Sequence, residues 1–385
     1  MRVLIYSPSN SLVVGGKEIY SILLGINLHK LGCEVTVFLS LGKTYFISDN
    51  LNELKTMLED NFSLLKNSSH PRNSYFNKFL REWGDSKKIS ELISKNDILY
   101  VNIPSPSFDF FPLKAKIFRK FSFRGWIKAK TESKIKTITI LHGTPNESIR
   151  GSLEYINEMN KIQKNIVLSN VAKNFLVTQG LKNSIKVIST GVDTNFFYPR
   201  PIEEKTNFIN ILFVGRIEEE KGLDELIESF KICKVSGLKI KLKIVGKYMN
   251  SKYKNYISKK IQEFKKDIEI IETVNYNQMP EVYKTSDIFI LPSHFEGMPL
   301  SILEAMSSGL SVITTKVGGI PELITDGING LLIEKGDITS LSQAIEKLNK
   351  NEEFRKKLGI EARRTVLEKY DWKIISKKIL NAYDE

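Results

Sequence analysis

The feature that constrains the fold most is an alternation of short β-type runs and helical patterns, which occurs twice along the chain. In the first half, RVLIYS is followed by a turn-rich stretch and by IYSILLGINLHKLG, whose apolar residues recur at helical spacing. Gly32 stands where such a helix would end, and CEVTVFLS is typical of the next strand. In the second half the alternation begins again with INILFVG, a helical pattern and KIKLKIVG. Two such series predict an α/β protein of two doubly wound domains, each with a parallel sheet.

The length of the chain agrees with two domains. It has 385 residues, whereas a single hydrophobic core usually stops growing at roughly 250–300 residues. The stretch TGVDTNFFYPRPIEEKTN contains two prolines and no clear periodicity, which is typical of a domain boundary. We therefore expect an N-terminal domain at 1–195, a C-terminal domain at 196–370 and a final helix at 371–385. Helical patterns also occur within 43–95, but the pattern does not indicate how they are ordered.

The charge balance allows two interpretations. The chain has 57 Lys and Arg residues against 44 Asp and Glu, a formal net charge of +13. Such an excess favours anionic partners, such as phosphates, lipid head groups or nucleic acid, but it is also typical of a solvated, lysine-rich surface. Two cysteines, Cys33 and Cys233, exclude a disulfide framework and an ordinary cysteine-based zinc site. No apolar run approaches the roughly 18–20 residues of a membrane span, so we expect a cytoplasmic protein.

The most basic stretch lies at 112–136. It carries nine Lys or Arg residues and one Glu, and its interleaved aromatic residues are Phe118, Phe121, Phe123 and Trp126. Basic and aromatic residues together suit an anionic membrane surface, and a solvated segment of the N-terminal domain is the alternative. A peripheral position on the inner face of the membrane is therefore a second expectation.

Two local features could bind an anion. Gly15 and Gly16 lie between a predicted strand and a predicted helix, where free backbone N–H groups favour a phosphate; a tight turn is the alternative. Arg216 follows a strand and Lys221 precedes a helix, at the edge where parallel sheets bind ligands. Two such cations would neutralise a diphosphate leaving group. Alternatively, they pair with a neighbouring carboxylate, that of Glu218, Glu219 or Glu220.

A pair of carboxylates lies in HFEGMPLSILEAMSSG. Glu296 precedes a glycine, Pro299 suits the first turn of a helix, and Glu304 falls inside that helix, which Gly309 would close. Both carboxylates could accept hydrogen bonds from sugar and ribose hydroxyls. Their spacing alone is weak evidence, because the chain has 44 acidic residues.

The flanking residues add a resemblance. The run from Val214 to Leu332 resembles the nucleotide-binding domain of glycosyltransferase family 4, the retaining enzymes of the GT-B fold. Its motifs occur in order as VGRIEEEKGLDELIESF, KIVGK and PEVYKTSDIFILPSHFEGMPLSILEAMSSGLSVITTKVGGIPELITDGINGLLI, and Glu296 and Glu304 form the E-x7-E signature. The N-terminal half is similar through GGKEIYSILLGINLHKLGCEVTVF, DILYVN, ITILHGTP and STGVDTNFFYP. The resemblance covers most of the chain except about 43–95 and 104–135.

The resemblance implies a GT-B fold, with two Rossmann-like domains that face a central cleft. It further implies a hexosyltransferase that moves a sugar, with retention, from a UDP- or GDP-linked donor to a glycan or lipid-linked acceptor in polysaccharide or glycoconjugate biosynthesis. Because no D-x-D pair occurs, neither a cofactor nor a divalent metal is expected. No obvious nucleophile occurs either, so same-face attack assisted by a phosphate oxygen is favoured.

The resemblance also assigns roles to single residues. Arg216 and Lys221 would hold the donor diphosphate, Glu296 would contact the transferred sugar, and Glu304 would accept from the ribose. His142 in LHGT would face the donor sugar. The implied catalytic set is thus Arg216, Lys221, Glu296 and His142. The implied donor-binding set, in which Val274 contacts the base, is Gly15, Gly16, Gly215, Val274, Gly297, Met298, Pro299, Leu300 and Glu304.

Two other classes stay open at this point. Sugar-nucleotide epimerases and glycan phosphorylases share the GT-B architecture, but the combination of R-x4-K and E-x7-E argues against both. The net positive charge also suggests a second class, a non-enzymatic protein that binds nucleic acid or a membrane. Outside 112–136 the basic residues are dispersed, and no recognised nucleic-acid motif occurs. The expected partners are therefore a nucleotide sugar and an acceptor, and not nucleic acid.

Overall fold

A computed structural model describes residues 1–7, 16–39, 43–46, 96–103, 136–142, 156–157, 159–160, 162, 164–200 and 207–384. The chain divides into two compact units: unit 1 is Met1–Ser189 with Ser376–Glu385, and unit 2 is Thr190–Ile375. These limits lie a few residues from the division expected at 195 and 370, and the roles given to the two domains stay predictions. Three sequence-based assignments lie outside the described residues: Gly15, most of 43–95, and 112–135 of the basic stretch.

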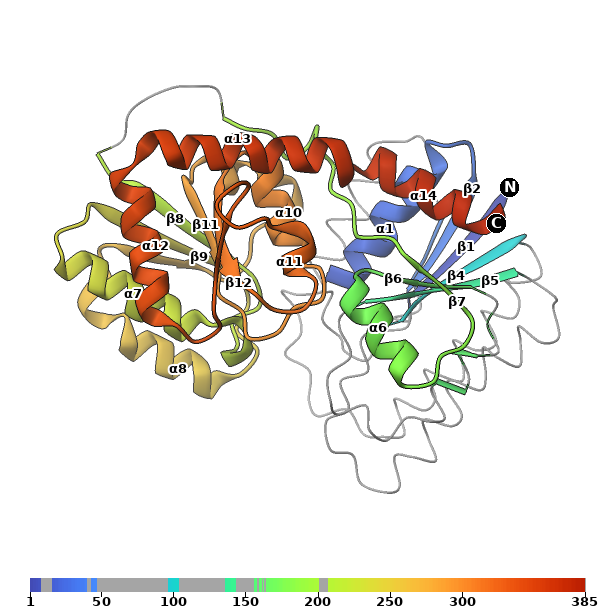
Figure 1. Ribbon diagram of the computed structural model, residues 1–385, viewed down its shortest axis with the longest axis horizontal. Helices are drawn as coiled ribbons and strands as arrows, with labels where there is room; N and C mark the ends of the chain where they lie inside the picture. Colours follow the sequence, from blue (N-terminus) through green and yellow to red (C-terminus); the bar gives the residue numbers. More distant parts are fainter. Residues whose placement is uncertain are drawn as a thin grey trace, which may run out of the picture. The chain divides into compact units, whose positions relative to one another are not determined.

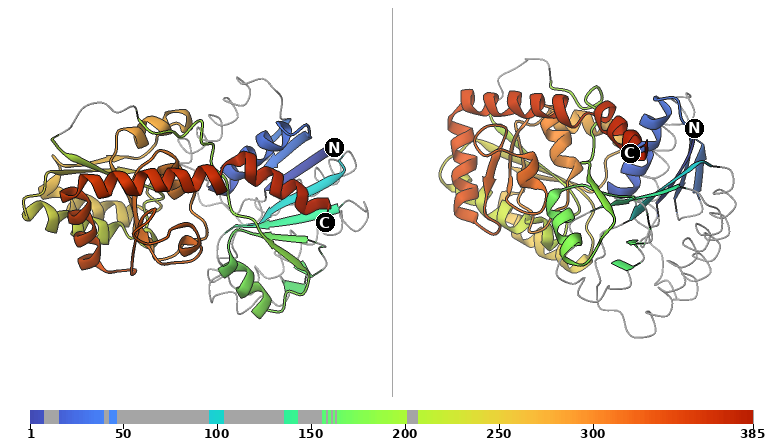
Figure 2. Two further views of the ribbon diagram at one scale, coloured as in Figure 1. Left: turned by 45° about the horizontal axis from the view of Figure 1, so that its top comes forward. Right: turned by 45° about the vertical axis from the view of Figure 1, so that its right-hand side comes forward.

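Unit 1 contains a sheet in the order β3-β2-β1-β4-β5-β6-β7. Its strands are parallel except for the β2–β3 pair, which is antiparallel. The left view of Figure 2 shows the strands side by side. Their bounds are β1 Arg2–Ser7, β2 Glu34–Leu39, β3 Lys43–Phe46, β4 Ile98–Ile103, β5 Lys136–Leu141, β6 Lys164–Val167 and β7 Ser184–Val187, and the helices are α1 Gly16–His29 and α6 Asn170–Thr178.

Helix α1 forms where the apolar periodicity predicted it. Tyr20, Leu24 and Leu28 are buried and lie four residues apart, which gives the helix a continuous apolar side for packing on the sheet. Gly32, at a φ of 88°, lies in the left-handed region just after the helix. The chain then enters β2, which pairs in parallel with β1.

The last residues of the chain complete unit 1. Helix α14, Trp372–Asp384, begins in unit 2, and its later turns belong to unit 1. There the Tyr100 hydroxyl donates to the carbonyl of Ile379 at 3.4 Å, and Lys164 Nζ donates to the carbonyl of Ala382 at 3.0 Å. Ile379 and Ala382 are buried, so this segment forms part of the unit 1 core.

Unit 2 contains a parallel sheet in the order β10-β9-β8-β11-β12-β13. Every residue of β11 and β12 is buried, as expected where helices cover both faces of a parallel sheet (Figure 1). The strands are β8 Ile209–Val214, β9 Ile240–Val245, β10 Ile268–Ile271, β11 Ile288–Leu291, β12 Ser311–Thr315 and β13 Leu331–Ile333. The α-helices are α7 Leu223–Val235, α8 Ser251–Lys260, α9 Met279–Lys284, α10 Leu300–Ser307, α11 Ile320–Leu323, α12 Ile338–Lys350 and α13 Glu352–Lys369, and the short 3₁₀ helices are η2 Glu219–Lys221, η3 Gln262–Phe264 and η4 Tyr276–Gln278.

The two βα series of the sequence correspond to these two sheets, which confirms the predicted α/β fold class. In both units the first strand lies in the interior of the sheet and the chain then builds outward on either side. This is the strand order of a doubly wound domain, in which ligands bind at the point where the order reverses. Among the described residues, no helix combines the length and the apolar character of a membrane span.

Candidate functional site

The order of the unit 2 sheet reverses between β8 and β11. Strand β8 pairs with β9 on one side and with β11 on the other, so the chain leaves the ends of β8 and β11 in opposite directions. The loops at these two carboxyl ends border the crevice in which such sheets bind ligands. Gly215 and Arg216 follow β8, and Pro292 to Glu296 follow β11. The motifs singled out in the sequence therefore meet at this reversal.

A glycine fixes the approach of the first loop to the second. Gly222 follows η2 at a φ of 67°, and a Cβ atom there would lie 2.0 Å from the carbonyl oxygen of Pro292. Only glycine allows both the left-handed conformation and this close approach. The backbone N–H of His294 then donates to the carbonyl of Glu220 at 2.8 Å. These contacts bring Lys221 next to the loop that carries Glu296.

Lys221 and Glu296 form an ion pair that is well shielded from solvent. Lys221 Nζ lies 2.6 Å from Oε1 of Glu296, with side-chain exposures of 13% and 11%. The Ser293 hydroxyl donates to the same oxygen at 2.8 Å. The alternative in which Lys221 pairs with one of the three preceding glutamates is therefore wrong for Lys221. The Glu296 carboxylate is held by donors from two loops.

Arg216 is paired differently. Its Nη2 lies 2.8 Å from Oε1 of Glu218, and its Nη1 donates to Oε2 at 3.2 Å. The Arg216 side chain is 52% exposed, and exposed ion pairs contribute only about 0–1 kcal/mol. Burial raises the pKa of Glu218, while the charges of Arg216 and Lys221 oppose that shift and the charge of Glu296 adds to it. Arg216, Glu218, Lys221 and Glu296 thus form one electrostatic cluster.

Glu304 lies within helix α10, where it is 8% exposed. The Tyr283 hydroxyl donates to its Oε2 at 2.6 Å. Burial raises the pKa of Glu304 to about 7, and the hydrogen bond from Tyr283 opposes the rise. The expected helix around Glu304 is present: Pro299 is its N-cap and Gly309, at a φ of 74°, follows its end.

The remaining donor-binding candidates of unit 2 follow the carboxyl ends of β8, β10 and β11. Gly215 follows β8 directly and donates its N–H to the carbonyl of Val245 at 3.0 Å. Val274 follows β10 and is half-buried. The loop before α10 is tied to the next loop by a 2.9 Å hydrogen bond from the N–H of Gly319 to the carbonyl of Gly297. Met298 and Pro299 in that loop are buried, and Leu300 begins α10.

Unit 1 brings two further candidates to one edge of its own sheet. Gly16 is the first residue of α1, after β1, and His142 follows β5. The rings of Tyr20, in the second turn of α1, and His142 meet edge to face, with centroids 4.5 Å apart. The beginning of α1 and His142 are therefore neighbours at the carboxyl ends of the parallel strands.

Two residues of the site were missed by the sequence analysis. Ser293 completes the environment of Glu296, and Tyr283 that of Glu304. Ser293 stands three residues before Glu296, so its proximity could have been noticed. Tyr283 is 21 residues from Glu304, and their contact depends on how α9 and α10 pack.

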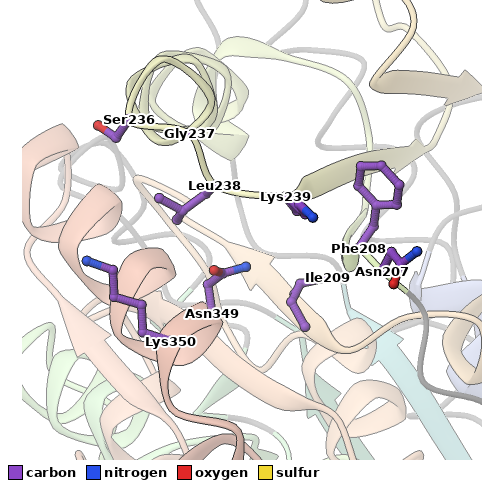
Figure 3. A pocket seen from close by; sticks show the side chains of 9 residues that line it. All are labelled: Asn207, Phe208, Ile209, Ser236, Gly237, Leu238, Lys239, Asn349 and Lys350. Atoms are coloured by element: carbon purple, nitrogen blue, oxygen red, sulfur yellow. The ribbon is translucent and has the colours of Figure 1, made fainter.

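Two pockets of unit 2 lie away from this site, at the opposite edge of the sheet. One has a volume of about 410 Å³ and includes Phe208 and Ile209 at the start of β8. Figure 3 shows Asn349 and Lys350, at the end of α12, across from Leu238. The other, about 340 Å³, is lined by four lysines, Lys241, Lys243, Lys265 and Lys266, among other residues. Neither pocket includes a candidate site residue.

Comparison with protein families gives two consecutive matches. A family model described as Glycosyltransferase Family 4 matches residues 14–196, and one described as Glycosyl transferases group 1 matches residues 195–365. An uncharacterized glycosyltransferase of Methanocaldococcus jannaschii is 29% identical over 87% of this chain and 92% of its own length. The capsular polysaccharide biosynthesis glycosyltransferase CapM of Staphylococcus aureus is 30% identical over 58% of this chain and 59% of its own length.

Solved structures are similar over the whole chain. Anabaena HepE in complex with UDP and glucose has a TM-score of 0.75 at 18% identity and covers 100% of this chain and 99% of its own. A glycosyltransferase of Rickettsia africae has a TM-score of 0.71 at 21% identity, with coverages of 100% and 97%. At such identities the likeness shows the fold, which is the expected GT-B fold. With the two family models joined end to end and glycosyltransferase relatives along its length, the chain belongs to the family 4, group 1 glycosyltransferases.

Proposed function

We propose that this glycosyltransferase is a retaining, metal-independent hexosyltransferase that uses a UDP- or GDP-linked sugar and a glycan or lipid-linked acceptor. The observation that carries the proposal is the cluster of Arg216, Lys221 and Glu296 at the reversal of the unit 2 sheet, with Glu304 in the adjoining helix. Two cations and two carboxylates there match the groups of a nucleotide sugar: a diphosphate, and the hydroxyls of a sugar and a ribose.

The two cations would stabilise the negative charge of the leaving group. A departing nucleoside diphosphate gains negative charge, and fixed cations that already point at that position stabilise the transition state. Arg216 is half exposed and weakly paired, so a phosphate can replace the carboxylate of Glu218. Because side chains supply this charge in the proposal, the reaction needs no divalent cation.

The carboxylates would orient the donor. A carboxylate can accept about four hydrogen bonds. Glu296 can therefore accept hydrogen bonds from sugar hydroxyls in addition to those from Lys221 and Ser293. Glu304 would receive the ribose hydroxyls. Backbone N–H groups of Gly297, Met298 and Leu300, at the start of α10, would contact the sugar and the distal phosphate, while Pro299 has no N–H to donate. In unit 1, Gly16 would offer its backbone N–H to a phosphate and His142 would face a sugar.

The proposed chemical step occurs on one face of the sugar. The bond between C1 and the leaving phosphate oxygen breaks, while the acceptor hydroxyl oxygen forms a bond to C1 on the same face. The acceptor's proton passes to an oxygen of the departing phosphate. Because the acceptor attacks C1 directly, no enzyme carboxylate forms a covalent bond to the sugar. The product then keeps the anomeric configuration of the donor.

Similar proteins support this choice of substrates. HepE of Anabaena has been solved with UDP and with UDP-glucose, which supports a uridine nucleotide donor. CapM belongs to capsular polysaccharide biosynthesis, which supports a glycan or lipid-linked acceptor. Docking of 112–136 on an anionic membrane, next to a lipid-linked acceptor, completes the proposal. Epimerases and phosphorylases of the same fold gain no such support from the glycosyltransferase relatives.

Nucleotide binding tests the proposal. We expect UDP or GDP and their sugar conjugates to raise the thermal unfolding temperature, because a ligand at about 100 times its Kd stabilises the folded state by about 2.7 kcal/mol. The shift should be the same in EDTA. A shift that EDTA abolishes contradicts metal independence, and the absence of any shift with UDP, GDP or ADP contradicts the donor site.

A further inference from the structure

Tyr283 is placed to control the carboxylate of Glu304. Its hydroxyl lies 2.6 Å from Oε2 of Glu304 and 3.5 Å from the carbonyl oxygen of Ser301. A hydroxyl has one hydrogen to donate, and the shorter contact, to a carboxylate, is the stronger. Helix α9, which carries Tyr283, thereby makes a polar contact with α10.

The Tyr283 ring is held firmly. It is fully buried, with its centroid 5.5 Å from that of Phe197 and 6.1 Å from that of Phe289. Closely packed aromatic rings have few alternative rotamers. The hydroxyl therefore has a fixed position, and Glu304 has a fixed donor.

The surroundings of Glu304 otherwise disfavour its charged form. Burial raises its pKa, and the hydrogen bond from Tyr283 opposes that rise. Burial raises the pKa of Tyr276 in η4, and the charges of Glu304 and Asp193 raise it further. On α13, Arg363 donates to the carbonyl of Ser307 at the end of α10. Strands β11 and β12 carry no titratable side chain in IFIL and SVITT.

We propose that Tyr283 is a positioning residue for the nucleotide donor: its hydroxyl keeps the Glu304 carboxylate ionised and oriented to accept hydrogen bonds from the ribose. The inference rests on the proposed function, since it requires that Glu304 bind the ribose. Tyr283 itself contacts Glu304 and acts through it.

The direction of the pH effect follows from the chemistry. The charged carboxylate is the stronger acceptor, so nucleotide affinity should fall as the pH falls through about 7, the region in which Glu304 takes up a proton. Tyr283→Phe removes the hydrogen bond that favours the charged form. The pKa of Glu304 then rises further, and affinity is lost at a higher pH than in the wild type. Near neutral pH we expect about tenfold weaker binding.

Calorimetric titration across pH about 6 to 9 tests the inference, with UDP and GDP and with inorganic pyrophosphate as ligands. Pyrophosphate has no ribose, so its affinity should be equal in the wild type and Tyr283→Phe. Tyr253→Phe is the matched control. Tyr253 is also buried in unit 2, and its hydroxyl donates to Asp224 at 2.9 Å, so this variant should leave nucleotide binding unchanged. Glu304→Gln cannot ionise and should leave only the pH dependence of the ligand's own terminal phosphate, whose pKa is about 6.

The outcomes separate the inference from the proposed function. Weaker nucleotide binding with a higher pH midpoint, at unchanged pyrophosphate affinity, supports the role of Tyr283. Wild-type affinity and midpoint in Tyr283→Phe overturn it, as does an equal loss for pyrophosphate and nucleotide at every pH, which indicates general damage to the fold. If the wild-type chain binds pyrophosphate but no nucleoside diphosphate, the proposed donor site itself is wrong.

Discussion

The charged residues of the site differ in how well their ion pairs are shielded from solvent. Lys221 and Glu296 form a shielded pair supported by Ser293, whereas Arg216 is half exposed and pairs with Glu218 from its own loop. A shielded pair costs more to separate than an exposed one. Arg216 is therefore the cation that can exchange its carboxylate partner for a phosphate at little cost.

Arg216→Ala should remove transition-state stabilisation of about 3–4 kcal/mol, a loss of roughly 10²–10³-fold in turnover with the accepted donor. Steady-state kinetics with the full chain measure the loss. Arg364→Ala is a suitable control, because Arg364 also pairs with a neighbouring glutamate, Glu361, on the outside of α13. Turnover of Arg216→Ala at the wild-type rate contradicts the assignment.

The sequence predicted where the candidate residues lie in the sheet better than it predicted their partners. Arg216 falls at the end of an apolar run, so topology alone brings it to the carboxyl edge of the sheet, where ligands bind. The pairing of Lys221 with Glu296 joins residues 75 positions apart, and that of Tyr283 with Glu304 joins two helices. Such contacts depend on the packing of elements, which local patterns do not encode.

At the scale of elements, turns bring the loops of the site together. The turn from η2 into α7 touches the loop after β11 only because Gly222 has no side chain. The backbone of η2 is also connected to the neighbouring loop by the hydrogen bond between His294 and Glu220. The position of Lys221 is therefore a property of this turn.

Gly222→Ala should destabilise the protein more than Gly237→Ala does. Both glycines have a positive φ, of 67° and 83°, and each substitution costs roughly 1–2 kcal/mol for the left-handed conformation. Only at Gly222 does the new Cβ collide with a backbone carbonyl, while nothing lies within 4 Å of it at Gly237. Urea unfolding measures both variants, and nucleotide titration should show weaker binding for Gly222→Ala alone. Equal losses of stability for both variants contradict this account of the turn.

Most strands could be predicted because they are buried runs of β-branched and other apolar residues, with helices between them. Strand β3, Lys43–Phe46, could not. It is a four-residue strand at the edge of the sheet, and it pairs antiparallel to β2. An alternation of strands and helices indicates parallel neighbours, so an added antiparallel edge strand has no signal in that pattern.

At the scale of the whole molecule, the chain passes between the two units twice, after Ser189 and after Ile375. The restart of the βα alternation predicted two domains, since each series needs its own sheet. The association of the last residues with unit 1 rests on contacts of long sequence separation, such as that between Lys164 and Ala382. Near the second crossing, the N–H of Trp372 donates to the carbonyl of Val192 at 3.1 Å within unit 2, so the two connecting segments are tied to each other.

The most direct test of the central claim is the reaction itself, followed by NMR on the full chain. The nucleotide sugars whose nucleotides bind are incubated with saccharide and lipid-linked acceptors in the presence of EDTA. The account predicts release of the nucleoside diphosphate together with a glycoside that has the same anomeric configuration as the donor. An inverted product contradicts the proposed same-face mechanism, and the absence of diphosphate release from every nucleotide sugar contradicts the proposed donor chemistry.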